Sequence, residues 1–437
     1  MGFFKKSKKQ PKPQAVVVGL DGVPFSLLAN LKQSGLIPKM GAIFDKGYFG
    51  KMQVSIPEIS SVSWSSFMTG KQSGEHGIYG FIDLEPGTYN MYFPNYLDVK
   101  ATTLWDEIAQ NDKKSVIINM PSTYPAREMN GALISGFVAI DINKAVTPSA
   151  LIPRLNGFDY RIDIDTAKAR RDPELLFSDL DGTLTGRQRA VDLLWQEIDW
   201  DLFIVVITGT DRLMHFLWTA CEQPDHPYHP AFRDYFTKLD DFIGQIYDRF
   251  MNASPSNTDF KEFYMLSDHG FCKIKAEVHL NRWLQENGYL KFQRNPPETI
   301  MDIGPGSTVF ALDPSRIYIN LKSRYPLGTV TGTDYDQLCR EIKTGLEALR
   351  SDSGDPVVKK VYFKDELFHG PYLSAAPDLV VLSNPGYDLK GKVSAAEVFG
   401  RTDLEGMHTQ DDAFFYSSSG AQLKSIFEAK EMIRRSF

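Results

Sequence analysis

Residues 15–22 read AVVVGLDG, and this stretch decides the fold class. Its valine-rich apolar run ends at Asp21-Gly22 without a polar interruption. A continuous β-branched run that stops at a turn is typical of a strand buried on both faces, as in a parallel sheet. A helical pattern follows from Phe25 to about Ser34, and Gly35 stands where a helix C-cap is expected. The stretch therefore predicts the first strand and helix of an α/β fold.

Similar short apolar runs recur along the chain, at residues 115–119, 203–208, 263–266 and 379–382. Helical patterns separate several of them, which predicts a largely parallel sheet covered by helices. Residues 271–370 differ, because they combine Pro296-Pro297, an alternating strand at 316–322 and a helix at about 334–349. We expect a basic flexible tail (1–14), a catalytic core (15–270), an inserted cap with approximate bounds (271–370) and the completion of the core (371–437).

Composition limits the classes of function. The 437 residues carry a formal net charge of −7, which gives no electrostatic reason to expect nucleic acid as a partner. The three cysteines are odd in number and far apart, so a reducing, cytoplasmic location is expected. No apolar run approaches the roughly 20 residues that span a bilayer. The basic tail is expected to be solvated, with at most a weak contact to acidic lipid.

Aspartates and histidines gather at the predicted strand ends. Asp21, Asp211 and Asp268 each follow a buried-strand candidate, and ligands of open α/β sheets bind at the carboxyl ends of strands. Asp211 and His215 are four residues apart on one helix face, and His269 follows Asp268 directly. With His408, three carboxylates and three imidazoles favour Zn²⁺, with Mn²⁺ or iron as alternatives. The other histidines are expected to be structural: His76, His226, His229, His279 and His369.

A nucleophile candidate lies in the serine-rich stretch 57–78. Ser60 opens a helical pattern that ends near Gly70, and a serine at a helix start is by default an N-cap. The same position favours a bound phosphate through the exposed N–H groups of the helix. Both interpretations hold if a neighbouring serine caps the helix while Ser60 attacks.

The ordered motifs resemble one family. They are VVVGLDG (16–22), SSVSWSSFMTGKQSGEHGI (60–78), TGTDRLMHFLW (208–218), LSDHGF (266–271) and GMHTQDD (406–412). Together they resemble the type I phosphodiesterase/nucleotide pyrophosphatase branch of the alkaline phosphatase superfamily, close to its predicted phosphohydrolase/phosphomutase group. The resemblance implies an alkaline-phosphatase-like three-layer α/β sandwich with a mostly parallel central sheet and an inserted cap.

The same resemblance implies a site with two divalent metal ions, Zn²⁺ before Mn²⁺. Asp211, His215 and His408 would hold one ion, and Asp21, Asp268, His269 and the Ser60 oxygen would hold the other. Ser60, which family spacing favours over Ser61 and Ser63, would attack the phosphorus of a small phosphate ester and form a phosphoserine. The expected activity is that of a metal-dependent phosphohydrolase or phosphodiesterase.

Two departures from related patterns narrow this expectation. Phe81 stands where nucleotide pyrophosphatases have an asparagine that holds a phosphate oxygen, so that donor is unassigned and a nucleotide substrate is less favoured. Ser60 is followed by Val62 and Trp64, which does not fit the maturation motif of type I sulfatases. The substrate, the choice between monoester and diester, and the oligomeric state are left open.

Residues 179–185, DLDGTLT, resemble the nucleophile loop of haloacid dehalogenase phosphatases. The apolar run before them is only three residues long, and the following residues have helical spacing. We therefore interpret DLDGTLT as a turn that caps the helix preceding Asp211, and not as a second active site. Two other functions stay open on the main site: a phosphomutase with the same nucleophile, and a non-catalytic binding protein.

Overall fold

The computed structural model describes residues 14–252 and 261–437, so the tail predicted for 1–14 lies outside the described residues except for Gln14. Its central sheet has eight described strands. The strands β9, β1, β8, β5 and β6 pair in parallel. β19 pairs antiparallel with β9 and with the edge strand β2, and the edge strand β7 pairs antiparallel with β6. In spatial order they are β2 (Tyr48–Met52), β19 (Ala413–Ser417), β9 (Lys261–Leu266), β1 (Gln14–Leu20), β8 (Leu202–Ile207), β5 (Ser115–Met120), β6 (Gly131–Ser135) and β7 (Val146–Thr147).

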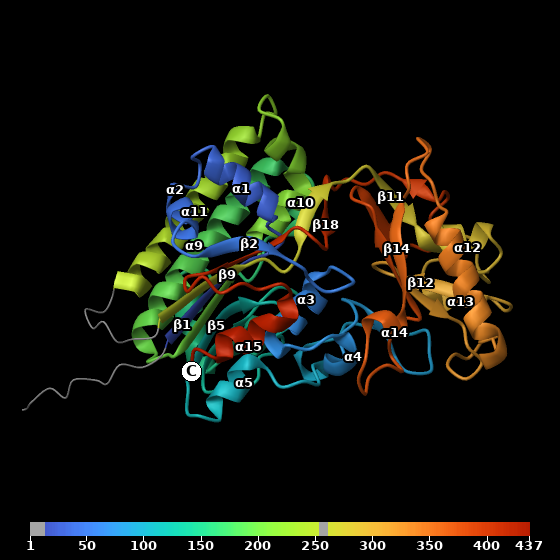
Figure 1. The fold of residues 1–437 in the computed structure, drawn as a ribbon, viewed down its shortest axis with the longest axis horizontal. Helices are drawn as coiled ribbons and strands as arrows, with labels where there is room; N and C mark the ends of the chain where they lie inside the picture. Colours follow the sequence, from blue (N-terminus) through green and yellow to red (C-terminus); the bar gives the residue numbers. More distant parts are fainter. Residues whose placement is uncertain (1–13, 253–260) are drawn as a thin grey trace, which may run out of the picture.

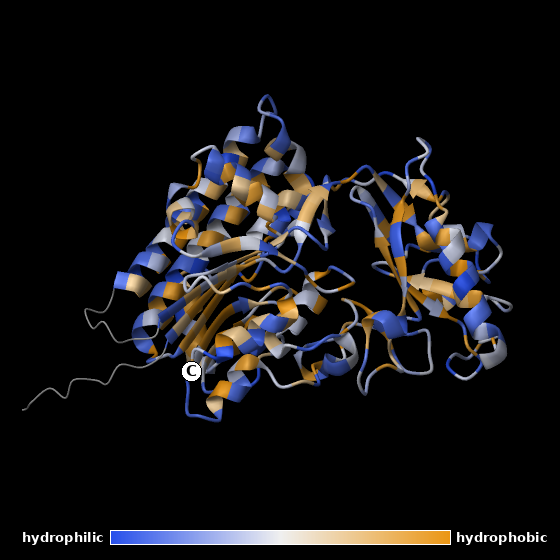
Figure 2. Cartoon of the chain, in the orientation of Figure 1, coloured by the Kyte–Doolittle hydropathy of each residue, from blue (hydrophilic) through white to orange (hydrophobic). Residues whose placement is uncertain are grey.

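Helices cover both faces of this sheet (Figure 1). Successive residues of β1 alternate between two hydrophobic cores, with Val16 and Val18 in one and Ala15 and Val17 in the other. The first core packs against α1 (Phe25–Gln33), α2 (Pro38–Phe44), α9 (Pro173–Glu197), α10 (Gly209–Glu222) and α11 (His229–Asn252). The second packs against α3 (Ser60–Thr69), α5 (Leu104–Ala109) and α15 (Ala429–Arg434). The structure thus confirms the α/β sandwich with a mostly parallel sheet, and Figure 2 shows its apolar strands inside.

A second body is built around an antiparallel sheet with its own hydrophobic core. The sheet order is β12 (Val309–Leu312), β13 (Arg316–Ile319), β15 (Leu379–Ser383) and β14 (Val358–Phe363). A smaller sheet joins β16 (Tyr387–Lys390), β11 (Ala276–His279) and β17 (Phe399–Gly400). The helices of this body are α12 (Leu280–Glu286), α13 (Gly332–Glu347) and α14 (Lys364–Leu367).

The run 379–382 forms a buried strand as predicted, but its sheet differs from the expectation. It is β15, which pairs antiparallel with β13 and β14 in the second body, and it takes no part in the central sheet. The chain passes between the two bodies along the strand pair β10 (Gly270–Lys273) and β18 (Gly406–Thr409), and it rejoins the central sheet at β19. The domain limits at 271, 370 and 371 remain predictions.

The interpretation of DLDGTLT as a turn is wrong. Residues 179–185 lie inside the continuous helix α9, which begins after Asp172 with Pro173 in its first turn. The Asp172 carboxylate accepts a hydrogen bond from the Glu174 N–H, so the cap lies seven residues before the motif. Asp179 pairs with Arg161 at 2.7 Å and accepts from the Asp165 N–H, which is a structural role.

Shorter elements complete the described chain. They are α4 (Ser73–His76), β3 (Asp83–Leu84), β4 (Met91–Tyr92), α6 (Ile142–Ala145), α7 (Ile152–Asn156), α8 (Thr166–Ala169) and four 3₁₀ turns at Tyr96–Asp98, Ser149–Leu151, Ile300–Asp302 and Ile426–Glu428. Among the residues described, no helix combines the length and apolarity needed to cross a membrane.

Candidate active site

The three predicted aspartates lie at the carboxyl ends of three adjacent strands. Asp21 follows β1, Asp268 follows β9, and Asp211 lies in the first turn of α10, which begins after β8. Because β1 lies between β9 and β8, their carboxylates reach one region of space. His408 arrives from β18, whose pairing with β10 sets it opposite Phe271 and beside His269, with the two imidazole rings stacked 3.6 Å apart.

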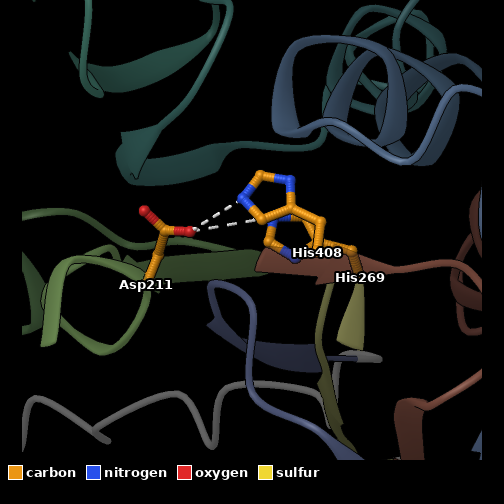
Figure 3. A group of neighbouring side chains, drawn as sticks. All are labelled: Asp211, His269 and His408. Carbon is orange, nitrogen blue, oxygen red and sulfur yellow. Dashed lines mark ion pairs between the residues drawn. The ribbon is translucent and has the colours of Figure 1, made fainter. Parts of the chain in front are cut away.

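One cluster joins Asp211, His215 and His408. The Asp211 Oδ1 atom lies 3.4 Å from His215 Nε2 and 3.2 Å from His408 Nε2, and the two Nε2 atoms are 3.0 Å apart. Ligand atoms about 2.0–2.1 Å from a tetrahedral zinc ion are about 3.3 Å from one another. The three atoms therefore already stand at the mutual distances of a cation's ligands. Figure 3 shows the Asp211 carboxylate directed at the imidazoles of His408 and His269.

A second cluster joins Asp21, Asp268, His269 and Ser60. His269 Nε2 lies 3.6 Å from Asp21 Oδ1 and 3.4 Å from Asp268 Oδ2. The Ser60 Oγ atom lies 3.1 Å from His269 Nε2 and 3.3 Å from Asp21 Oδ1. His269 Nε2 is also 4.0 Å from Asp211 Oδ1, which places the two clusters side by side. All seven predicted residues thus meet in one place.

Backbone carbonyl groups fix the orientation of the three imidazoles. His215 Nδ1 donates to the Gly406 oxygen at 2.8 Å, His408 Nδ1 to the Glu58 oxygen at 3.0 Å and His269 Nδ1 to the Gly270 oxygen at 3.1 Å. A carbonyl oxygen only accepts, so each Nδ1 carries the hydrogen. In its neutral form each ring then directs the lone pair of its Nε2 atom into the cluster, which is the arrangement of metal-binding histidines.

Two carboxylate oxygens in the clusters are buried without hydrogen-bond partners among the described residues: Asp211 Oδ1 and Asp268 Oδ2. The opposite oxygens are held by the protein, since Asp268 Oδ1 accepts from the Gly22 N–H and Asp211 Oδ2 from Arg212. Asp21 Oδ2 accepts from the Trp64 indole. Gly22 has a φ of +73°, and a Cβ there would lie 3.1 Å from the His269 ring. Buried, unpartnered acceptors are costly unless a cation satisfies them, so the donor set fits metal ions.

Burial and mutual repulsion shift the pKa values of these groups. Burial, followed by the charges of Asp268 and Asp211, raises the pKa of Asp21 well above its ordinary value. Burial also raises the pKa of Asp268 to about 6 and lowers that of His215 to about 4. For Asp211 burial acts in the opposite direction from His215, His408 and Arg212, which together hold its pKa below the ordinary range. Asp21 and Asp268 therefore lack enough positive charge around them in the protein itself, whereas Asp211 is compensated by its neighbours.

Ser60 is the first residue of α3, whose N-cap is Ile59 without a side-chain capping bond. Neither Ser60 nor a neighbouring serine therefore caps this helix, and the N-cap interpretation of Ser60 does not hold. Ser60 is 2% exposed, and its hydroxyl group is directed at Asp21 and His269 and not at the helix backbone. The helix ends as predicted, with Gly70 in the left-handed region at φ 66°.

Sequence reasoning missed the residues that surround the clusters. Arg212 donates to Asp211 Oδ2 at 3.2 Å and to Asp163 Oδ2 at 2.6 Å. Trp64 holds Asp21, and the Glu58 carbonyl holds His408. Arg212 and Trp64 stand inside the quoted motifs, but Asp163 is 49 residues from Arg212 and only the fold joins them.

The five other histidines make contacts outside these clusters, as expected of structural residues. His76 bonds Ser66, and burial lowers its pKa to about 3. His279 donates to the Glu397 oxygen, His229 to the Ala220 oxygen, His226 accepts from the Tyr228 N–H, and His369 lies near Glu75.

A cavity of about 620 Å³ opens onto the clusters between the two bodies. His215 and His408 lie on its wall together with Phe81 from the core, and Asp388 and Lys390 of β16 line the opposite side. The size suits a small ligand.

Comparisons with known proteins identify the family. The sequence model of the type I phosphodiesterase/nucleotide pyrophosphatase family matches residues 15–411. The chain therefore belongs to this family, whose members hydrolyse phosphate esters. A search of curated protein sequences found no match.

Solved structures share the fold along nearly the whole chain. Phosphonoacetate hydrolase from Sinorhizobium meliloti 1021, in complex with phosphonoacetate, has a TM-score of 0.65 at 13% identity, covering 98% of this chain and 96% of that chain. The murine ectonucleotide pyrophosphatase/phosphodiesterase 5, an inactive form in complex with AMP, has a TM-score of 0.56 at 14% identity, covering 97% and 94%. The human counterpart gives 0.57 at 13% identity, covering 97% and 94%. These likenesses show the alkaline-phosphatase-like fold.

Proposed function

We propose that the protein is a metal-dependent phosphohydrolase or phosphodiesterase that acts through a phosphoserine at Ser60. The observation that carries this proposal is a group of three carboxylates and three imidazoles, with two buried acceptors left unpartnered, in which Asp21 and His269 contact the Ser60 hydroxyl. Asp211, His215 and His408 would hold one divalent ion, and Asp21, Asp268, His269 and Ser60 would hold the other. The N/O donor set without thiolate favours Zn²⁺, with Mn²⁺ as the alternative.

Two such ions would lower the pKa of the Ser60 hydroxyl and offset the charge that develops on the attacking and leaving oxygens. The protein itself orients the candidate ligands. Trp64 and Gly22 fix Asp21 and Asp268, and the three carbonyl groups fix the imidazoles, so the site is organised before substrate arrives. The burial of Ser60 keeps bulk water away from its hydroxyl group.

The reaction would proceed in two displacements. In the first, the Ser60 Oγ–P bond forms while the bond from phosphorus to the ester oxygen breaks; Ser60 loses its hydroxyl proton, and the departing alkoxide takes up a proton. In the second, water attacks the phosphoserine and the Ser60 Oγ–P bond breaks; the water oxygen stays with phosphorus, and a proton returns to Ser60 Oγ. In a phosphomutase the phosphoserine would instead return its group to the bound product.

The test is the replacement Ser60→Ala with p-nitrophenyl phosphate mono- and diesters as substrates. We expect kcat to fall by about 10³-fold or more, with both ions still bound, because the nucleophile is lost and the other ligands remain. Ser61→Ala is the matched control, since the Ser61 hydroxyl has no hydrogen-bond partner among the described residues. Equal activity of the Ser60 variant and the wild type would refute the nucleophile.

Turnover in ¹⁸O-labelled water separates the two fates of the phosphoserine. Label in the released phosphate or phosphomonoester supports hydrolysis. Unlabelled, isomerised product would assign a phosphomutase instead. Fewer than two bound ions together with no turnover of any ester would favour a non-catalytic binding protein.

The location and the remaining partners are proposed on sequence grounds. A cytoplasmic location follows from the cysteine pattern, and Cys221, Cys272 and Cys339 are all free thiols. A weak membrane contact of the basic tail falls on residues that the structure does not describe.

A further inference from the structure

Arg212 lies between a predicted metal ligand and a second carboxylate. Its guanidinium group donates to Asp211 Oδ2 at 3.2 Å, and its Nε and NH2 atoms donate to Asp163 Oδ2 at 3.1 Å and 2.6 Å. The guanidinium carbon also lies 4.9 Å from the centre of the Phe137 ring. The Arg212 and Asp163 side chains are only 19% and 21% exposed, so solvent screens this charge pair incompletely.

Arg212 donates its hydrogen bond to Asp211 Oδ2, the carboxylate oxygen that faces away from the histidines. Asp211 Oδ1 is the oxygen that approaches His215 and His408, and it stays unpartnered. The arginine therefore leaves the ligand atom free while placing a fixed positive charge on the same carboxylate. Such a charge opposes the binding of a cation at Oδ1.

The two clusters differ in charge and in exposure. Asp21 and Asp268 supply two carboxylates, and with His269 their side chains are at most 1% exposed. The other cluster has one carboxylate, already paired with Arg212, and its His215 and His408 side chains are 21% and 16% exposed on the cavity wall. Charge and burial thus favour tighter cation binding in the Asp21 cluster.

We propose that the Arg212–Asp163 pair sets the affinity of the Asp211–His215–His408 site and makes it the weaker, exchangeable site of the two. The inference rests on the proposed function, because it presupposes that both clusters bind cations. Arg212 weakens the cavity-facing site through its charge, and Asp163 limits this effect by neutralising part of that charge. Arg212 and Asp163 are positioning residues, since neither is a predicted ligand.

The alternative is that the pair only orients Asp211. Loss of an outer partner that orients a ligand lowers metal affinity, typically by about 10–100-fold. Under that alternative, disrupting either member weakens the site. A charge effect predicts opposite signs for the two members, and this difference can be measured.

The experiment titrates the chelator-stripped full-length protein with Zn²⁺ and with Mn²⁺ in competition with a chromophoric chelator. For the wild type we expect two steps whose dissociation constants differ by about tenfold or more. Arg212→Gln keeps a hydrogen-bond donor and removes the charge, so it should tighten the weaker step by about tenfold. Asp163→Asn leaves the Arg212 charge unopposed and should weaken the same step by a similar factor.

Controls keep the test independent of folding. Arg212→Lys retains the charge and should leave the weaker step nearer to the wild type than Arg212→Gln does. Arg161→Gln removes a neighbouring arginine that pairs with Asp179 outside the clusters, and it should change neither step. Circular dichroism verifies that each variant is folded. If Arg212→Gln does not fold, Arg212→Lys decides, because a charge effect leaves the weaker step near the wild type whereas a purely orienting role weakens it.

Equal affinities of the two wild-type steps would overturn the proposal, and so would weakening of the site in both Arg212→Gln and Asp163→Asn. Binding of no ion by the wild type would instead refute the proposed function. The result of the Ser60 experiment is unaffected by any change in the relative affinity of the two sites, so the two failures are distinguishable.

Discussion

Asp268 is a predicted metal ligand whose two carboxylate oxygens differ in their hydrogen bonding. It is fully buried, one oxygen accepts from the Gly22 N–H, and the other has no hydrogen-bond partner among the described residues. Burial raises the pKa of its carboxyl group to about 6, although the nearby His408 lowers it. In the absence of a cation, the folded protein therefore holds the protonated acid below a pH of about 6, whereas a bound cation requires the carboxylate.

This shift predicts how cation binding depends on pH. Below about 6 the Asp268 carboxyl group holds a proton that a cation must displace, so the apparent affinity should fall as the pH drops through that value. His215, with a pKa lowered to about 4, stays neutral over the same range. Titration of Zn²⁺ at several pH values between 5 and 8 measures the effect, and an affinity that is constant over this range would contradict it.

The raised pKa of Asp268 also makes the stability of the folded protein depend on pH. The folded protein retains the Asp268 proton at pH values where the unfolded chain, with an ordinary pKa of 3.8, has released it. The metal-free protein should therefore lose stability as the pH rises from about 4 to about 6, and added cation should restore it.

At the level of single residues, the sequence indicated the candidate metal ligands but not the residues that hold these ligands in position. The aspartates were found because each follows an apolar strand, and His215 and His269 because of their spacing from an aspartate. His408 was assigned through the family resemblance of its motif. The roles of these residues remain predictions. Asp163 could not be found in this way, because it lies in a polar segment with no pattern and reaches Arg212 only through the fold.

At the level of elements, short apolar runs predicted strands well and sheets less well. Residues 203–208 and 263–266 lie in β8 and β9 beside β1. Residues 379–382 have the same character but form β15 in the antiparallel sheet of the second body. A buried strand is apolar on both faces in either sheet, so its partners depend on contacts far away in sequence.

The helix α9 shows why a local motif failed as evidence for a turn. Gly182 lies within it, and a glycine in a helix costs only about 1 kcal/mol, which packing of Leu176, Leu180 and Leu184 into the core readily offsets. The capping residue Asp172 and Pro173 give the true helix start.

We expect Asp179→Asn to leave kcat and the bound metal unchanged. Asp179 pairs with Arg161 on the surface of α9, and the exchange removes only a partly exposed ion pair, with a stability cost of about 1 kcal/mol or less. Steady-state kinetics and urea unfolding check both expectations. An inactive variant that still binds two ions would make Asp179 a second reactive carboxylate.

At the scale of the whole molecule, we expect the charged residues that line the cavity between the two bodies to select the substrate. Carboxylates predominate among its charged side chains, with Glu58, Glu277, Asp313 and Asp388 against Arg170 and Lys390. The Lys390 ammonium is already paired with Asp388 at 2.7 Å. We therefore expect the cavity to disfavour leaving groups that carry additional phosphates.

The replacement Glu58→Gln tests this electrostatic selection. One Glu58 carboxylate oxygen has no hydrogen-bond partner among the described residues, and burial raises the pKa of the group to about 7. In assays above that pH, removing the charge should raise kcat/KM for a nucleoside triphosphate by about tenfold relative to p-nitrophenyl phosphate. Asp411→Asn, an exposed residue paired with Lys359, is the control. An unchanged ratio in the Glu58 variant would contradict the prediction.

Anomalous diffraction from crystals grown with Zn²⁺ and with Mn²⁺ shows directly whether the two clusters bind two ions. We expect two cation peaks: one within bonding distance of Asp211, His215 and His408, and one within bonding distance of Asp21, Asp268, His269 and Ser60 Oγ. A single peak, or a second peak that Ser60 cannot reach, would contradict it.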